Sequence, residues 1–301
     1  MVPRSLLGVG ALLLVLLLAA AIPPRDSGDE ATPRVVQGQV AVEAEMVAIL
    51  CPPGYDNGRP DNVCLAFNGT IPGPTFVFRE GDAVTVKVKN RVEETVQALD
   101  VPPAVKSKFV GRAFSMHRHG TDAPPTMDGI APHTGTSFPD SRVPAKGEFT
   151  YAFTTPFVGT WHYHDHAFGP DGSLRNPSTD RGFGSEGAER GLFGSLLVLP
   201  RSAPTPTVFD LHLLDHGPNG GLGMNGNVAV GERFLISLVG LGSEWWDVVV
   251  TDPDGVVIAS HTVSAGSSHG VLVEAAKRGA YTWSAWGVFH IDPFEGQVVA
   301  S

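Results

Sequence analysis

The segment that decides the fold class is a short alternating run, Val84-Thr85-Val86-Lys87-Val88-Lys89. Successive side chains of a strand point to opposite faces, so the three valines would face a core while the lysines face water. The polar residue Asn90 ends the run. A period of two over six residues predicts a half-buried β-strand.

Similar short runs recur along the whole chain. In the first half they lie at 40–46, 75–79, 149–154 and 194–199, and in the second half at 207–211, 234–239, 246–251, 256–260, 270–274 and 280–286. The 36 glycines and 25 prolines favour short strands joined by tight turns over helix bundles. We therefore predict an all-β chain built from sandwich or barrel domains.

The length of 301 residues, 42% of them hydrophobic, allows two ordinary cores. Residues 200–206 are rich in Pro, Ser and Thr and separate two series of strand patterns, which makes them the best linker candidate. We predict a first domain over residues 38–202 and a second over residues 203–301.

The N-terminal segment has the layout of an export signal. Residues 1–22 carry Arg4 and then an apolar run from Leu6 to Ala21, with small residues at its end that offer a cleavage site. The run is close to the shortest length that spans a bilayer, so an uncleaved anchor is the alternative to a cleaved signal. Residues 23–37 are predicted to be a tether. We expect a secreted, periplasmic or cell-surface protein that meets a membrane only through this segment.

The formal net charge is −10, and no clustered face of Lys and Arg is evident. Phosphate binding needs such a face, so nucleic acid is not expected as a partner. The charge is compatible with a cationic ligand.

The chain has two cysteines, Cys51 and Cys64, separated by a loop rich in Pro, Gly and Asn. An oxidising compartment favours a disulfide between them. The alternative, a thiolate metal ligand, would call for a nearby histidine or a Cys-x-x-Cys spacing, and neither is present.

Histidines cluster in two short segments, at positions 117 and 119 and at positions 162, 164 and 166. They form three His-x-His pairs, whereas random placement would give roughly 0.4. Residues i and i+2 of a strand project to the same side, so two such strands side by side can bring four ring nitrogens together. Clustering of this kind favours a metal site over histidines satisfied by backbone groups. Imidazole ligands suit copper, zinc, nickel or iron, and the affinity order favours copper, with zinc second.

Aspartates near these histidines are candidates for a supporting role. Asp122, Asp128 and Asp165 could accept hydrogen bonds from ligand rings and so fix their tautomers. We therefore expect them behind the metal ligands.

Further segments accompany the histidines in a fixed order, which is Phe67-Asn68-Gly69-Thr70-Ile71-Pro72-Gly73-Pro74-Thr75, Glu80-Gly81-Asp82, His-x-His-Gly at 117–120, Asp128-Gly129, and Trp-His-Tyr-His-Asp-His at 161–166. In order and spacing they resemble the first domain of multicopper oxidases. The last string, followed by Arg-Gly-Leu-Phe-Gly at 190–194, is especially similar to the two-domain, or small, laccases of bacteria. The resemblance covers residues 65–200 well and the remainder in outline. It implies two consecutive cupredoxin-like (plastocyanin-like) Greek-key sandwich or barrel domains.

The resemblance also implies a set of copper ligands for one or two ions. His117 would bind a type 2 copper, His119 and His164 would share one type 3 copper, and His166 would serve the other. His162 stands where many relatives have an aromatic residue and is expected behind the ligands, with Asp128 and Asp165. Asn68 matches a glycosylation acceptor, but the family motif explains it as a turn residue.

The second domain departs from the family pattern. A type 1 copper needs two histidines and a cysteine, usually with an axial methionine. In outline alignment the His-Cys-His positions fall on Ser284, Ala285 and Trp286, the axial position falls near residues 294–295, and His290 remains as a relic of the site. The other ligand strand, near residues 244–252, holds no histidine.

Replacement ligands are not expected from the other histidines of the second half. His212 lies in a strand pattern, and His216, His261 and His269 are expected in turns with surface roles. In two-domain relatives the copper cluster forms between neighbouring subunits of a trimer. The resemblance therefore implies a homotrimer or another cupredoxin as a possible partner, but a homotrimer of this chain would not restore the missing ligands.

Three functions follow from this pattern. The first is a copper-binding protein that sequesters, transfers or is stabilised by copper, without laccase turnover because the type 1 cysteine is absent. The second is an oxidoreductase in which a coupled copper pair reacts with oxygen or peroxide. The third is a non-catalytic subunit that packs against another cupredoxin through an aromatic edge containing Trp245, Trp246, Trp283 and Trp286, although tryptophans are more often core residues.

Overall fold

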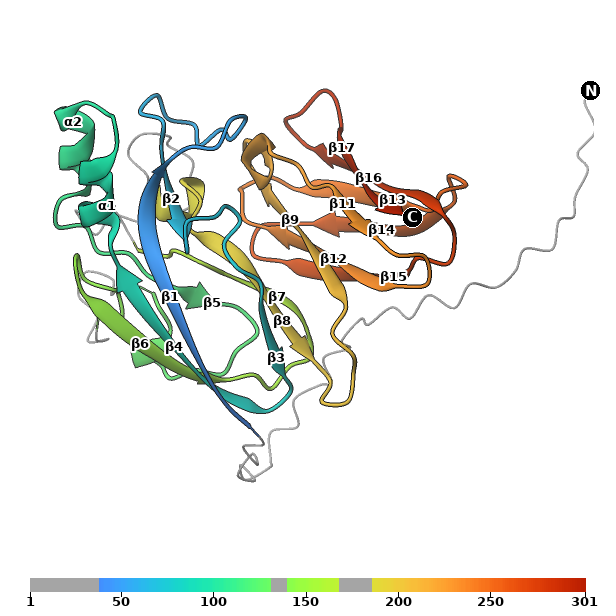
Figure 1. Cartoon of the computed structure of the whole chain (residues 1–301), viewed down its shortest axis with the longest axis horizontal. Helices are drawn as coiled ribbons and strands as arrows, with labels where there is room; N and C mark the ends of the chain where they lie inside the picture. Colours follow the sequence, from blue (N-terminus) through green and yellow to red (C-terminus); the bar gives the residue numbers. More distant parts are fainter. Residues whose placement is uncertain (1–37, 131–139, 168–185) are drawn as a thin grey trace, which may run out of the picture.

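The computed structural model describes residues 38–130, 140–167 and 186–301. The signal or anchor expected at 1–22 and most of the tether expected at 23–37 lie outside these residues. Within the described ranges, the search for a helix with the length and apolarity to cross a membrane finds none. Strands dominate the chain, as predicted, and form four sheets (Figure 1).

The first half contains two four-stranded sheets. One has the order β2-β1-β4-β6, with β1 (Gly38–Leu50), β2 (Val63–Phe67), β4 (Asp82–Asn90) and β6 (Glu148–Thr154). The other has the order β3-β8-β7-β5, with β3 (Phe76–Arg79), β5 (His117–Arg118), β7 (Gly159–His164) and β8 (Phe193–Leu199). Their facing side chains form one hydrophobic core, which includes Phe67, Val86 and Tyr151. This sandwich carries all the predicted copper ligands.

The second half repeats the arrangement with its own core. One sheet has the order β10-β9-β12-β15, with β9 (Thr207–Leu214), β10 (Gly217–Pro218), β12 (Arg233–Gly240) and β15 (Ser268–Glu274). The other has the order β11-β17-β16-β13-β14, with β11 (Gly226–Val228), β13 (Trp246–Thr251), β14 (Val257–Val263), β16 (Gly279–Gly287) and β17 (Phe294–Ala300). Phe234, Trp246 and Trp283 fill the space between them. The molecule is thus two cupredoxin-like sandwiches, as expected.

Helical segments are short and lie in connections. They are α1 (Val92–Ala98), α2 (Pro103–Lys106), η1 (Ser107–Phe109), η2 (Pro125–Met127), α3 (Glu186–Glu189) and η3 (Asn219–Gly221). The longest, α1, packs against β1 through its buried residues Val92 and Val96. None of these helices contributes a predicted ligand.

The alternating run that indicated the fold class is confirmed in β4. Val84, Val86 and Val88 are buried, and Lys87 forms an exposed ion pair. Asn90 ends the strand through its side chain, whose Nδ2 donates to the carbonyl of Arg112 at 3.0 Å. A polar residue therefore stops the strand by binding a neighbouring loop.

The two halves meet through polar contacts as well as packing. Ser268 Oγ donates to the carbonyl of Thr160 at 2.6 Å, and Thr75 donates to Asp210. The connection from β8 to β9 is tied to the first half by Arg79, which donates to the carbonyl of Ala203 at 2.6 Å. The domain limits themselves, at 202 and 203, stay predictions.

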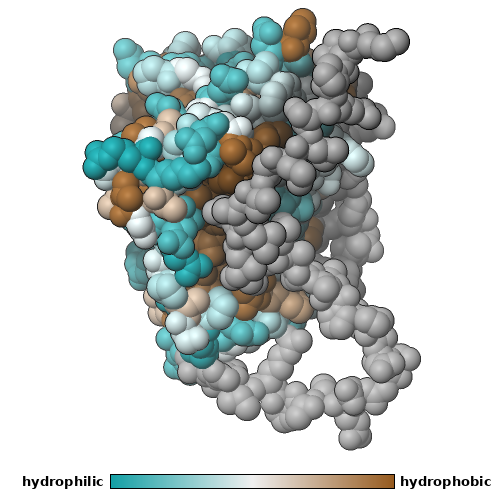
Figure 2. Space-filling view, turned by 90° about the vertical axis from the view of Figure 1, so that its right-hand side faces the viewer, coloured by the Kyte–Doolittle hydropathy of each residue, from teal (hydrophilic) through white to brown (hydrophobic). Residues whose placement is uncertain are grey.

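The four tryptophans of the proposed aromatic edge divide into two kinds. Trp246 and Trp283 are fully buried, whereas Trp245 is 62% exposed and Trp286 is 40% exposed. The side of the molecule that carries the second sandwich shows apolar side chains among polar ones (Figure 2). Half of the predicted edge is therefore core, and the other half is available at the surface.

The disulfide between Cys51 and Cys64 is present, as predicted, so neither sulfur is a free thiolate. Asn68 lies in a tight turn with a positive φ of 53°, and its Oδ1 accepts the amide of Glu45 at 2.8 Å. The turn interpretation of this asparagine is thus consistent with its conformation.

Candidate metal centre

The two histidine segments lie side by side, as the spacing predicted. Strands β5 and β7 are antiparallel and pair His117 with His164. The amide of His119 then donates to the carbonyl of His162 at 2.9 Å, which extends the pairing past the end of β5. Adjacent strands therefore present the rings of one His-x-His pair to those of the other.

Three of the four predicted ligands form a compact set. One ligand nitrogen from each of His117, His119 and His164 lies within 4.8 Å of the other two. The Nε2 atoms of His119 and His164 are 3.3 Å apart, a separation that one bound ion could bridge. Three converging imidazoles without a carboxylate or thiolate suit copper or zinc.

The fourth predicted ligand, His166, lies beside this set. Its ring centroid is 5.2 Å from that of His117 and 5.4 Å from that of His164. It follows the end of β7, and its amide donates to Ser115 Oγ at 2.8 Å. His166 is close enough to share the site, although it stands outside the three-residue group.

Backbone carbonyls set the orientation of two of the rings. His117 Nδ1 lies 2.8 Å from the carbonyl oxygen of Asp128, and His164 Nδ1 lies 2.9 Å from that of Asp165. An Nδ1–H that donates to a carbonyl leaves Nε2 unprotonated and available to a metal. The carboxylate of Asp128 adds a longer contact of 3.5 Å to the same His117 nitrogen.

The carboxylate of Asp165 holds the loop that carries the ligands. Its Oδ1 accepts the amide of Ser115 at 2.6 Å, the hydroxyl of Ser115 at 3.3 Å and the amide of Ala167 at 3.2 Å. Ser115 in turn holds the backbone of His166. Ser115 is a supporting residue that the sequence did not reveal, because a lone serine before a His-x-His pair carries no distinctive pattern.

His162 lies immediately behind the set and is completely buried. Its ring stacks on that of His119, with centroids 3.9 Å apart and planes 23° apart. Neither of its ring nitrogens has a hydrogen-bond partner among the described residues. The place of His162 behind His119 agrees with the supporting role expected of it, and that role stays a prediction.

Burial favours the neutral form of three of the histidines. Burial, and then repulsion from His117 and His166, lowers the pKa of His119 to about 4. Burial, and then repulsion from the neighbouring histidines, lowers the pKa of His164 well below its usual range, and burial also lowers the pKa of His166. Neutral imidazoles offer the lone pair that a metal requires, so these rings are ready to bind at neutral pH.

The carboxylate of Asp128 is held in its charged form beside His117. Burial raises its pKa, but the hydrogen bond and charge of His117, together with Arg118, outweigh burial and lower the pKa overall. It therefore supplies a negative charge that partly compensates a bound cation.

The contacts of Arg118 and Gly120 explain why these residues stand between and after the histidines of the His-x-His-Gly motif. Arg118 points away from the histidines and lies over the rings of Tyr151 and Phe153, at 4.7 Å from each centroid. Gly120 has a φ of +68°, and a Cβ there would stand 2.0 Å from the ring of Trp161. The His-x-His-Gly motif thus needs a long residue that reaches the core and a glycine that lets Trp161 approach.

The second half provides a different environment at the position that the sequence predicted to be a relic of a type 1 site. Ala285 is buried in the core, and the ring of His290 packs over Trp246 with centroids 5.0 Å apart. His290 Nε2 lies 3.6 Å from Oε1 of the buried Glu244. Within the described part of this half, no three candidate ligands come close enough to hold a metal.

The remaining histidines correct one expectation. His212 lies in β9 and His216 in a turn, as predicted, but the prediction of turns for His261 and His269 is wrong, because they lie in β14 and β15. A turn rich in Ser and Gly occupies only the residues between the two histidines. His261 is held in β14 by pairing with β13, and His269 is held in β15 by pairing with β12.

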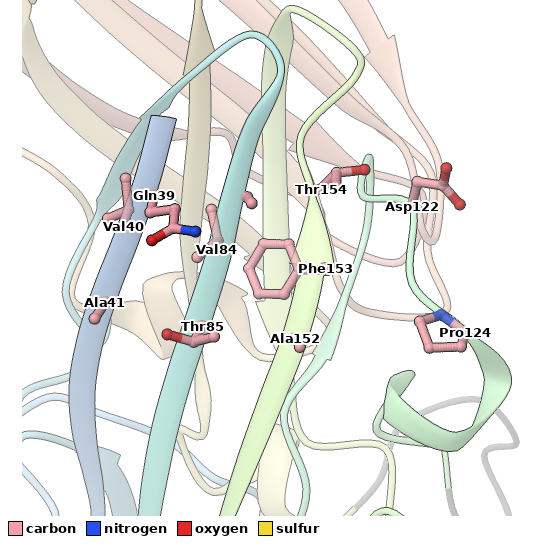
Figure 3. Close-up of a pocket in the computed structure, with 11 residues that line it drawn as sticks. Gln39, Val40, Ala41, Val84, Thr85, Asp122, Pro124, Ala152, Phe153 and Thr154 are labelled. Atoms are coloured by element: carbon pink, nitrogen blue, oxygen red, sulfur yellow. The ribbon is translucent and has the colours of Figure 1, made fainter. Parts of the chain in front are cut away.

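A pocket of about 710 Å³ lies on the first sandwich (Figure 3). It is lined by strands β1, β4 and β6, with Asp122 and Pro124 at one side. None of the candidate ligands lines it. Asp122 therefore borders this pocket, and its predicted role behind the ligands stays a prediction.

Comparison with known proteins agrees with the fold and with copper chemistry. A family model described as "Multicopper oxidase" matches residues 55–98. A copper resistance protein A homolog of Pseudomonas syringae pv. tomato is 38% identical over 103 residues, which cover 34% of this chain and 14% of that protein. The multicopper oxidase MmcO of Mycobacterium tuberculosis is 30% identical over 169 residues, 54% of this chain and 29% of that protein. The matched parts thus span under a third of these two relatives.

Solved structures extend the similarity across both sandwiches. The multicopper oxidase mgLAC superposes with a TM-score of 0.52 at 19% identity, covering 88% of this chain and 86% of that one. A copper nitrite reductase from Nitrosomonas europaea superposes with a TM-score of 0.53 at 16% identity, covering 87% and 94%. At these identities the likeness establishes the shared two-sandwich fold.

Proposed function

We propose that this chain is an exported copper-binding protein of the multicopper oxidase family that holds copper through His117, His119, His164 and His166 and lacks laccase turnover. The observation that carries the proposal is the convergence of three ring nitrogens within 4.8 Å of one another. The fourth histidine stands beside them. Similarity to copper resistance proteins and multicopper oxidases supports copper as the ion.

The residues fit copper better than other common ions. All four donors are imidazoles, which excludes the oxygen-rich coordination that calcium and magnesium prefer. The Irving–Williams order then favours copper, with zinc second. Two of the rings have their Nδ1 atoms tied to backbone carbonyls, so Nε2 is directed to the ion without further rearrangement.

The absence of laccase turnover rests on the cysteines. A type 1 copper needs a thiolate, but the chain has two cysteines and both are in the disulfide. Ala285 occupies the position of the type 1 cysteine in outline alignment, and it is buried in core. Bound copper would supply a redox-active ion, but the chain lacks the thiolate that receives electrons from substrate.

A second candidate function is a copper oxidoreductase with a two-ion site, in which oxygen or peroxide would bind directly at the metal. It is favoured by the position of His166, which stands apart from the close His119–His164 pair and could serve a second ion. A third candidate is a non-catalytic subunit that packs against another cupredoxin through the exposed Trp245 and Trp286. Assembly of this chain into a homotrimer is a separate proposal, which rests on the resemblance to two-domain multicopper oxidases.

The experiment measures metal content per chain and the visible spectrum of protein purified without chelator. We expect one or two copper ions, no intense blue band, and loss of copper in the His164→Ala/His166→Ala variant. The matched control is His216→Ala, which removes an imidazole from a turn in the other half. Copper that is unaffected by the double variant, or phenol oxidation at laccase-like rates, contradicts the proposal. Absorption of an oxygen-bridged copper pair would favour the two-ion oxidoreductase.

Export and domain organisation complete the proposal. The disulfide agrees with an oxidising compartment, which supports a secreted, periplasmic or cell-surface location. The separate cores of the two sandwiches support domains over residues 38–202 and 203–301, with copper confined to the first.

A further inference from the structure

A second pair of imidazoles lies across the open side of the second sandwich. His261 is in β14, the outer strand of one sheet, and His269 is in β15, the outer strand of the other. Their rings are nearly parallel, with centroids 4.8 Å apart and planes 25° apart. Two sheet edges that share no ladder hydrogen bonds thus approach each other through two histidine side chains.

Strand alternation explains why both rings turn inward. His261 shares its face of β14 with the buried Val263, and His269 shares its face of β15 with the buried Val271. Both histidines are half-buried, so one side of the pair borders the core and the other is open to solvent. An ion could therefore reach the pair without opening the sandwich.

The electrostatic surroundings leave the two rings free to bind a cation. The ring nitrogens of His261 and His269 make no hydrogen bond to any residue in the described part of the chain. Burial lowers the pKa of both histidines, and proximity to His269 lowers that of His261 further. No carboxylate opposes these shifts, so both rings are neutral at neutral pH and carry an available lone pair.

We propose that His261 and His269 together bind a late first-row divalent metal ion, with Cu²⁺ preferred and water completing its coordination. Two imidazoles without carboxylates favour Cu²⁺, Ni²⁺ or Zn²⁺ over calcium or magnesium. With two protein ligands, this site is weaker than the first-half centre. It is a separate site and does not depend on the function proposed for the first half.

Binding at this pair would join two sheet edges and steady the turn between β14 and β15. The turn and the start of β15 reach the first half, because Ser268 in β15 donates to the carbonyl of Thr160 and a Cβ at Gly266 in the turn would stand 4.0 Å from His119. An ion bound only by the folded state raises the free energy of unfolding. Metal at this pair should therefore stabilise the second sandwich and its contact with the first.

The test titrates the full chain, free of any affinity tag, with Cu²⁺ and Zn²⁺. Equilibrium dialysis gives the number of ions bound, electron paramagnetic resonance gives the nitrogen ligands of Cu²⁺, and thermal unfolding gives the stabilisation. We expect the His261→Ala/His269→Ala variant to lose the most weakly bound metal ion per chain. It should also lose the part of the metal-induced rise in Tm that this ion causes. His216→Ala should retain both.

Two further variants separate the possible outcomes. His261→Gln/His269→Gln keeps the size and polarity of the side chains and replaces the alanine variant should that variant unfold. The His164→Ala/His166→Ala variant should still bind the weakly held ion at His261 and His269. A wrong proposal for the first-half centre can therefore be told apart from a wrong proposal for this pair. Unchanged stoichiometry and unchanged metal-induced Tm in the glutamine variant would overturn the proposal.

Discussion

Replacing Asp165 with alanine tests whether a buried carboxylate holds the candidate metal centre in place. The side chain is 1% exposed and accepts the amides of Ser115 and Ala167 and the hydroxyl of Ser115. Asp165→Ala leaves two buried amides without that acceptor, and each costs about 1–3 kcal/mol. We expect the free energy of unfolding of the metal-free protein to fall by about 2–6 kcal/mol.

The same substitution should weaken copper binding, because Ser115 positions His166 and Asp165 lies between two candidate ligands. Loss of a supporting hydrogen bond behind metal ligands typically costs about 10–100-fold in affinity. Denaturant unfolding followed by tryptophan fluorescence gives the stability, and competition with a copper chelator of known affinity gives the binding constant.

Two controls define the result. Asp165→Asn keeps one carbonyl oxygen as an acceptor and should lose less than the alanine variant. Asp140→Ala removes a half-exposed carboxylate paired with Arg142, and a surface pair of this kind contributes about 1 kcal/mol or less. If Asp165→Ala left both unfolding free energy and copper affinity at the wild-type values, the carboxylate would not be holding the loop.

Three other substitutions or conditions test particular contacts. Gly120→Ala should destabilise the protein by about 1–3 kcal/mol or more, measured by denaturant unfolding, because its Cβ would clash with Trp161; wild-type stability would mean that the ring moves freely. The buried Arg190 lowers the pKa of Asp61 below its unfolded value of about 4, so this pair stabilises fully above that pH and the stability is lost as pH falls through the lower folded pKa. In the Asp61→Asn variant, the free energy of unfolding should fall less as the pH is lowered through the acid range. An unchanged fall would mean that other groups cause it. Cys51→Ala should lower stability by about 2–4 kcal/mol without removing bound copper, since neither cysteine is among the candidate ligands; loss of copper would contradict this.

The sequence predicted most of the longer strands. In β4, the alternation of valine with polar residues was visible, and the structure confirms it. The strands β8 and β12 were also predicted, although nearly all of their residues are buried, because each is a mostly apolar run. The strands β2 and β17 were not predicted: β2 is short and follows a loop rich in Pro, Gly and Asn, and β17 contains Gly296 and polar residues that weaken a strand pattern.

The candidate ligands were predictable for a different reason. Residues i and i+2 share a face of any strand, so a His-x-His pair fixes the direction of two rings before the fold is known. What the spacing could not give is the register that pairs His117 with His164, or the carbonyl of Asp128 that orients His117. Those depend on loops, whose backbone atoms carry no residue-specific signal.

The His261–His269 pair shows the limit of reading turns from composition. The five residues 264–268 between Val263 and His269 are small or polar and predicted a turn, and the turn exists, but the strands on either side extend to the histidines. Pairing of β15 with β12 supplies the ladder hydrogen bonds that local propensity does not reveal. The proximity of the two rings is a tertiary result, since they belong to different sheets.

The position in the second half that the sequence predicted to be a relic of a type 1 site is filled with packed side chains. Ala285 packs within the core, His290 lies over Trp246, and Glu244 approaches His290 from the remaining side. A vacated metal site would leave neutral donors around a space, whereas here an indole and a carboxylate surround the one remaining imidazole. Among the described residues of the second half, this position is therefore packed, and the copper binding proposed for this chain rests on the first-half histidines and on the His261–His269 pair.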